Sequence, residues 1–150
     1  MKRFRFRLEK ILRYKTQIED RKKQVLSECT IELNAEKAHL HKIEGDINAY
    51  GSRYSSLFRG RLNIRALIHS RRHLDKLDGD LKNQEKLVKK SEKKVDSAKT
   101  ALRDAMRDRK KYEKLEERKR RVYEYEMGRI ERKEFDEFGL KTKKPTGIFP

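Results

Sequence analysis

Residue types that build compact domains are rare in this chain. Its 150 residues include no tryptophan, two prolines and seven glycines, and only 34% of them are hydrophobic. A compact domain usually has about 45–50% apolar residues, so this sequence excludes a large buried core. A long two-faced helical rod and a disordered chain both remain possible, and the spacing of the apolar residues must decide between them.

Cysteines and long hydrophobic runs are also scarce. Cys29 is the only cysteine, so no disulfide can form within the chain and a reducing compartment is expected. Cys29 falls at a regular apolar position, and we interpret it as a packing residue. No apolar run exceeds three residues, which excludes a transmembrane segment. The basic first residues lack the apolar stretch of a secretory signal, so we expect a cytoplasmic protein.

Charge, by contrast, is abundant and mostly positive. Lysine and arginine number 42 against 25 acidic residues, which gives a formal net charge of +17. Such a chain favours an acidic partner, which can be nucleic acid, anionic lipid or an acidic protein surface.

Apolar residues in the first half recur at alternating steps of three and four, which is typical of a coiled coil. The first step, from Lys22 to Leu26, is four residues long, and steps of three and four alternate after it. The positions are Lys22, Leu26, Cys29, Leu33, Glu36, Leu40, Ile43, Ile47, Tyr50, Tyr54 and Leu57. The pattern continues toward the N-terminus through Ile18, Lys15, Ile11, Leu8 and Phe4. It therefore predicts a helix over about 4–57.

A second series predicts another helix over about 66–138. Its positions are Leu67, Ser70, Leu74, Leu77, Leu81, Gln84, Val88, Ser91, Val95, Ala98 and Leu102. The loop between the helices, 58–65, is short, so they should pack antiparallel. Gly60 is expected in the left-handed conformation, Asn63 as the N-cap of the second helix and Gly139 at its end.

The predicted fold class is therefore all-α, a long two-helix antiparallel coiled-coil hairpin over 1–140 with a flexible tail over 141–150. Folding the two series together places Leu40 opposite Gln84, Tyr50 opposite Leu74 and Lys22 opposite Leu102. In this register the N-terminus lies beside residues 109–121. Polar residues within the packed positions weaken a coil but can fix its register. Lys15 and Lys22 should let the open end of the hairpin splay.

No motif for catalysis or cofactor binding is present. The chain has no glycine-rich phosphate loop, its four histidines form no convincing metal cluster, and two helices enclose no deep pocket. We therefore expect no enzyme activity, no cofactor and no metal.

Three binding functions remain, of which a protein partner is favoured. DNA-reading coiled coils attach a continuous basic helix to a parallel dimer, whereas residues 103–121 mix ten basic with five acidic residues. A helix that lies on a membrane needs a broader apolar face than this one has. No nucleic acid partner is expected, although a basic coiled-coil nucleic-acid-binding protein remains an alternative.

Both ends of the chain resemble the flagellar export protein family FliJ. "FRFRLEKILRYK" (4–15) is similar to the basic, Phe-containing "FRLEKVL"-type opening of that family. "RRVYEYEMGRIERKEFDEFG" (120–139) is similar to its C-terminal pattern, which closes on an acidic-aromatic element such as Asp136-Glu137-Phe138 here. The resemblance implies a non-enzymatic stalk of the flagellar export apparatus at the inner face of the cell membrane. The equivalent stalk of a virulence type III secretion system is the nearest alternative.

The family's partners are the hexameric flagellar export ATPase, the cytoplasmic part of the membrane export gate, and export chaperones. The resemblance implies that the hairpin end with both termini binds the ATPase, through Phe4, Arg5, Arg7, Leu8, Ile11, Tyr14, Arg118, Arg121, Tyr125, Arg129 and Phe138. It implies that the coil nearer the loop binds the gate, through Ile43, Ile47, Tyr50, Tyr54 and Leu77. For this second set, packing within the hairpin is the competing interpretation.

Overall fold

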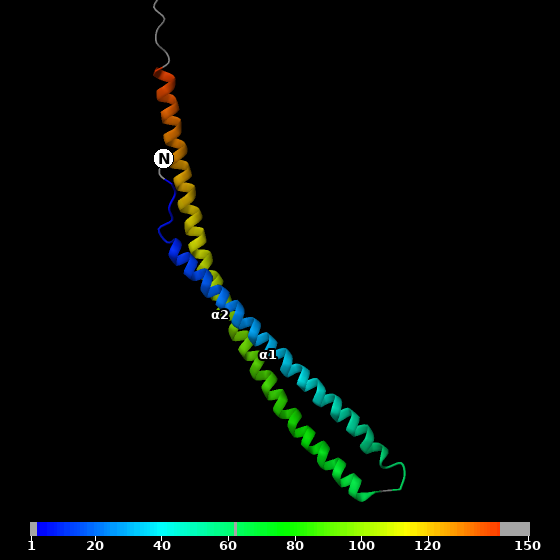
Figure 1. The fold of residues 1–150 in the computed structure, drawn as a ribbon. Coiled ribbons are helices and arrows are strands. Elements are labelled where there is room, and N and C mark those ends of the chain that lie inside the picture. Colours follow the sequence, from blue (N-terminus) through cyan, green and yellow to red (C-terminus); the bar gives the residue numbers. More distant parts are fainter. Residues whose placement is uncertain (1–2, 62, 142–150) are drawn as a thin grey trace, which may run out of the picture. The chain divides into compact units, whose positions relative to one another are not determined.

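Two long helices make up the protein (Figure 1). The structure is a computed structural model that describes residues 3–61 and 63–141. Helix α1 spans Glu9–Ser56 and helix α2 spans Ile64–Lys141, and no strand occurs in these residues. The predicted all-α helical hairpin is confirmed. The predicted flexible tail lies outside the described residues, apart from Lys141 at the end of α2.

Contacts between the helices divide the chain into two compact units. The first combines Met1–Gln17 with Met106–Pro150, and the second consists of Ile18–Ala105. In each unit a part of α1 packs antiparallel on a part of α2. One hairpin domain over 1–140 stays a prediction.

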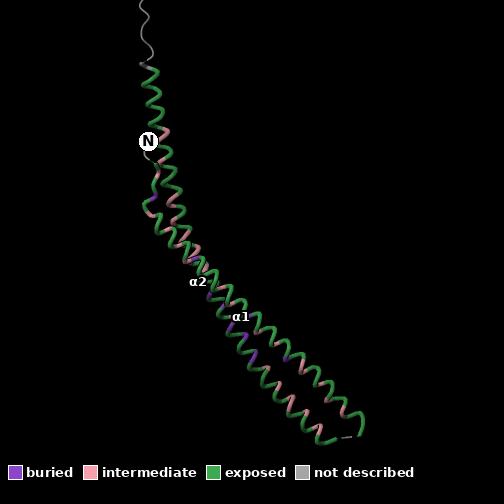
Figure 2. Tube along the Cα trace, in the orientation of Figure 1, coloured by how far each residue is buried: buried purple, intermediate pink, exposed green. Residues whose placement is uncertain are grey.

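The core of the second unit follows the predicted packing positions. Leu33, Val88 and Val95 are buried, and Leu26, Cys29 and Leu40 pack against them. Figure 2 marks buried residues in purple. Cys29 is therefore a packing residue, as expected. Lys22 is exposed although it falls at a packing position, because its long side chain can carry the ammonium into water.

A layer of polar side chains lies about one turn of α2 beyond Val88. Gln84 is buried, and its amide nitrogen donates to the backbone oxygen of Glu36 at 3.1 Å and also to the carboxylate of Glu36. His39 Nδ1 donates to Gln84 Oε1 at 3.0 Å. These contacts satisfy a buried amide that would otherwise destabilise the core. Gln84 was predicted opposite Leu40, so the register agrees with the prediction to within about one helical turn.

The N-terminal end of α1 corrects the sequence prediction. The helix begins at Glu9 instead of residue 4, and residues 3–8 are not helical. The reason lies in "RFRFRL", where apolar residues alternate with arginines. An α-helix would direct Phe4 and Phe6 to opposite sides, because they lie about 200° apart around its axis. A non-helical segment can turn both rings to one side.

The loop and the end of α2 differ from the prediction, since α1 ends at Ser56 and α2 spans Ile64–Lys141, where an end at 57 and a helix over 66–138 were predicted. At the C-terminal end of α1, backbone hydrogen bonds join residues three apart in the sequence. Leu57 N donates to Tyr54 O at 3.2 Å, and Arg59 N donates to Ser56 O at 3.1 Å. No described glycine has a positive φ, so Gly60 is not left-handed and Gly139 lies within α2 instead of ending it. Asn63 caps α2 as predicted, since its Oδ1 accepts from Ala66 N at 3.2 Å.

Candidate functional site

Burial alternates along the N-terminal segment, residues 3–8, in the first unit. Arg3, Arg5 and Arg7 are exposed, and the residues between them are buried or half-buried. Phe6 is the most buried of these, at 8% exposed, and sequence reasoning did not single it out. The period of two in "RFRFRL" was the available signal, since it is typical of a non-helical chain with one apolar side.

Phe4 anchors this segment on α2. Its ring centroid lies 5.6 Å from that of Tyr123, and the guanidinium carbon of Arg120 lies 5.6 Å from the Phe4 centroid. A cation at this distance from an aromatic ring is attracted to it. Arg120 is also paired with Glu116, at 3.1 Å. Phe4 is therefore held by an aromatic and a cationic neighbour from one side of α2.

A groove of about 840 Å³ lies between the N-terminal segment and α2. From α2 it is lined by Leu115, Lys119, Val122, Tyr123 and Glu126. The segment thus lies beside residues 115–126, somewhat further along α2 than the predicted 109–121. Three exposed arginines of the segment also line the groove, which therefore combines apolar and charged side chains.

Lys15 joins the two helices of the first unit. Its ammonium lies 3.1 Å from Asp108 Oδ2, and Lys111 lies 3.0 Å from Asp108 Oδ1. Hydrogen bonds from Lys111 and Lys15 hold the pKa of Asp108 below its usual value of 3.8. The predicted splaying at Lys15 is wrong, because an acidic partner on α2 offsets the charge that was expected to separate the helices.

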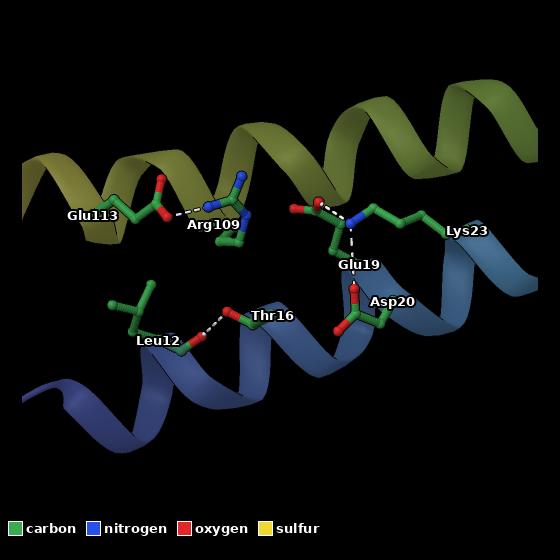
Figure 3. Close-up of polar contacts among 7 residues, drawn as sticks. All are labelled: Leu12, Thr16, Glu19, Asp20, Lys23, Arg109 and Glu113. Carbon is green, nitrogen blue, oxygen red and sulfur yellow. Dashed lines mark hydrogen bonds and ion pairs between the residues drawn. The ribbon is translucent and has the colours of Figure 1, made fainter.

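The polar contacts drawn in Figure 3 each join residues of the same helix. Thr16 Oγ1 donates to Leu12 O at 3.0 Å, and Arg109 pairs with Glu113. Further along α1, in the second unit, Lys23 reaches Glu19 at 2.8 Å and Asp20 at 3.2 Å, and these hydrogen bonds raise the pKa of Lys23. The ammonium end of the Lys23–Glu19 pair is exposed, whereas Glu19 is buried.

All eleven residues predicted to bind the ATPase fall in the first unit. Phe4 and Leu8 are half-buried, and the other nine are exposed: Arg5, Arg7, Ile11, Tyr14, Arg118, Arg121, Tyr125, Arg129 and Phe138. Tyr125 is 66% exposed and Phe138 is 72% exposed, which is unusual for aromatic side chains. The first unit therefore presents cationic and aromatic groups together.

The residues predicted to bind the gate lie in the second unit and differ in exposure. Ile43 is 7% exposed, so it packs within the hairpin. Ile47, Tyr54 and Leu77 are half-buried. The ring of Tyr50, which is exposed, lies 4.3 Å from that of His73, next to its predicted position opposite Leu74.

We find no metal-binding cluster within the described ranges, where no three His, Cys, Asp or Glu side chains gather closely enough. The helices of the described ranges also include none that is long and apolar enough to cross a membrane.

The fold and these surfaces define a coiled-coil protein with exposed cationic and aromatic groups. The family model described as "Flagellar FliJ protein" matches residues 4–142. Because this match covers nearly the whole chain, the protein belongs to the FliJ family, whose members serve flagellar and type III protein export.

The same fold occurs in a solved structure from Chlamydia trachomatis, CT670, described as a YscO homologue. It is 22% identical in sequence with a TM-score of 0.56, and the alignment covers 95% of this chain and 100% of that one. No curated protein matches this chain significantly.

Proposed function

We propose that this protein is the non-enzymatic stalk of a flagellar export apparatus, and that its first unit binds the hexameric export ATPase. The observation that carries this proposal is the gathering of Arg5, Arg7 and Arg118 with exposed aromatic rings in one unit of a FliJ-family chain. Aromatic and arginine side chains are the commonest anchors of protein interfaces. The arginines contact carboxylates of the ATPase, and Tyr125 and Phe138 supply apolar contacts.

A stimulation assay tests this proposal. The purified ATPase is titrated with the wild type and with an Arg5→Glu/Arg7→Glu variant. Two charge reversals at an interface convert attraction into repulsion, so we expect the concentration for half-maximal stimulation to rise about tenfold or more. Tyr125→Ala/Phe138→Ala tests the aromatic contacts in the same way.

The matched control is Lys82→Glu/Lys86→Glu, two exposed lysines in the second unit. It makes the same change in net charge and should stimulate as the wild type does. Equal loss in both charge variants would mean that only net charge matters, and normal stimulation by the arginine variant would contradict the proposed surface.

The second unit contacts the cytoplasmic part of the membrane export gate through Ile47, Tyr50, Tyr54 and Leu77, with Ile43 supporting them from inside. This arrangement keeps the protein in the cytoplasm, peripherally at the membrane, where it also meets export chaperones. Tyr50→Ala/Tyr54→Ala should weaken capture by the isolated gate domain without changing ATPase stimulation. Unchanged capture would exclude this contact.

The stalk of a virulence type III secretion system is a second candidate, favoured by the fold shared with the YscO homologue. A deletion strain separates the two. Loss of swimming supports the flagellar function, whereas loss of effector secretion with normal swimming supports the virulence function.

A further inference from the structure

A second groove lies between α1 and α2 within the second unit, outside both surfaces proposed above. Its volume is about 550 Å³. Its apolar lining consists of Val25, Cys29, Ala98 and Ala101. Its charged lining consists of Lys22, Lys90, Lys93 and Lys94. Ala98 is buried and Cys29 is half-buried, whereas Val25 is 45% exposed, so apolar surface is open to solvent here.

The sequence explains why the two helices leave a depression at this place. Lys22 occupies a packing position but is exposed, so no apolar side chain from that turn of α1 enters the interface. From α2, the lining residues Ala98 and Ala101 are small and fill little of the space. The packed positions on α1 also take two consecutive steps of four here, from Ile18 through Lys22 to Leu26, which locally changes the coil.

The charges around this groove are largely unpaired. Lys94 lies 2.7 Å from Glu32 Oε1. Across residues 3–61 and 63–141, Lys22, Lys90 and Lys93 have no carboxylate within ion-pair distance. No acidic residue of the described ranges lines the groove. The groove therefore combines apolar surface with at least three cations that lack a partner.

We propose that this groove binds an amphipathic helix of a partner protein whose apolar stripe is flanked by glutamate or aspartate. Two neighbouring helices form a groove that a third helix can follow, with its apolar residues against Val25 and Ala98. Its carboxylates then pair with Lys90 and Lys93 on one side and Lys22 on the other. This proposal does not rest on the ATPase or gate contacts proposed above.

Charge decides against the other occupants. A second copy of this chain would bring a net charge of +17 to a groove that is itself basic. A nucleic acid would neutralise the lysines, but its backbone offers nothing apolar to cover Val25, Cys29 and the alanines. An acidic amphipathic helix matches both features.

The test uses a synthetic peptide of about 20 residues with leucines at helical spacing and glutamates on both flanks. Cys29 lines the groove and is the only cysteine, so its rate of alkylation by N-ethylmaleimide reports occupancy. We expect saturating peptide to slow alkylation about fivefold or more, since a bound helix covers the thiol. A peptide of the same composition with scrambled leucines should leave the rate unchanged. Equal rates with both peptides would overturn the proposal.

Charge variants locate the contact. In Lys90→Glu/Lys93→Glu, the peptide concentration that gives half-maximal protection of Cys29 should rise about tenfold or more, because two attractive pairs become repulsive. Lys82→Glu/Lys86→Glu makes the same change in charge on the same helix, at residues that do not line the groove. In this variant the peptide should protect Cys29 as well as it does in the wild type. Equal weakening in both variants would overturn the proposal.

A single-stranded oligonucleotide of about 20 nucleotides serves as the competing probe. It should leave Cys29 alkylation unchanged. Protection by the oligonucleotide in the absence of protection by the peptide would assign the groove to nucleic acid and overturn the helix proposal.

Discussion

Phe6 shows how a single side chain sets the end of a helix. Its ring is buried although it lies in a strongly basic stretch, with arginines on both sides. Burying an aromatic ring removes much apolar surface from water and can offset the loss of a few helical hydrogen bonds. The chain therefore starts α1 at Glu9, where Glu9 N still donates to Phe6 O at 3.3 Å.

Replacing Phe6 tests whether this ring holds the N-terminal segment on α2. Phe6→Ala removes the buried ring, so we expect faster tryptic cleavage after Arg5 and Arg7, measured by mass spectrometry over time. Phe135→Ala is the control, because Phe135 is 77% exposed and its loss should not change cleavage there. Unchanged cleavage of the Phe6 variant would mean that other contacts hold the segment.

Asp108 gives a pH dependence at the residue scale. Its folded-state pKa is lowered by Lys111 and Lys15, so ionised Asp108 stabilises the folded protein above the usual pKa of 3.8. This contribution is lost as the pH falls through the lowered pKa. We expect Asp108→Asn to melt at a lower temperature than the wild type at pH 6, and the difference to shrink as the pH falls below 3.8. A constant difference at all pH values would contradict this.

Within the helices, two glycines weaken elements that need no glycine. A Cβ at Gly45 or Gly79 would meet no atom within 4 Å, and both residues lie inside helices without a positive φ. Each glycine destabilises a helix by about 1 kcal/mol relative to alanine. The low stability of these turns is therefore a property of the sequence and not a demand of the packing.

Alanine at these positions should raise the melting temperature. We expect about 2–4 °C for each of Gly45→Ala and Gly79→Ala, and a nearly additive gain in the double variant, measured by circular dichroism. A lower melting temperature in either variant would show that the helices approach each other more closely than the open space indicates.

At the scale of the whole molecule, the pairing of α1 with α2 occurs inside one chain. Glu36, His39 and Gln84 connect the helices in the second unit, and Lys15 and Asp108 connect them in the first. Such a hairpin needs no second copy to cover its apolar residues. The high net charge also opposes self-association.

The melting temperature should therefore be independent of protein concentration between about 5 and 500 µM, since unfolding of a monomer involves no dissociation. Circular dichroism supplies the measurement, and sedimentation should show one copy. A melting temperature that rises with concentration would mean that the helices pair between chains.

The sequence alone determined the two helices, their antiparallel pairing and the register to within about one turn. The reason is that Leu26, Leu33, Val88 and Val95 recur at a spacing that belongs to each helix by itself. Asn63 was likewise predictable, because an N-cap is a local hydrogen bond. The exposure of Arg5, Arg7 and Arg118 was also predictable, since arginine side chains are rarely buried.

Only the tertiary structure decided where α1 begins, how Lys15 is neutralised and where a groove opens beside Val25. Each of these depends on side chains of the other helix that are far away in the sequence, such as Tyr123 beside Phe4 and Asp108 beside Lys15. Residues 4–8 were interpreted as helical, although their apolar residues alternate with arginines at a period of two. A local pattern can predict which face of a helix packs, but the size and charge of the side chains opposite that face belong to the other helix.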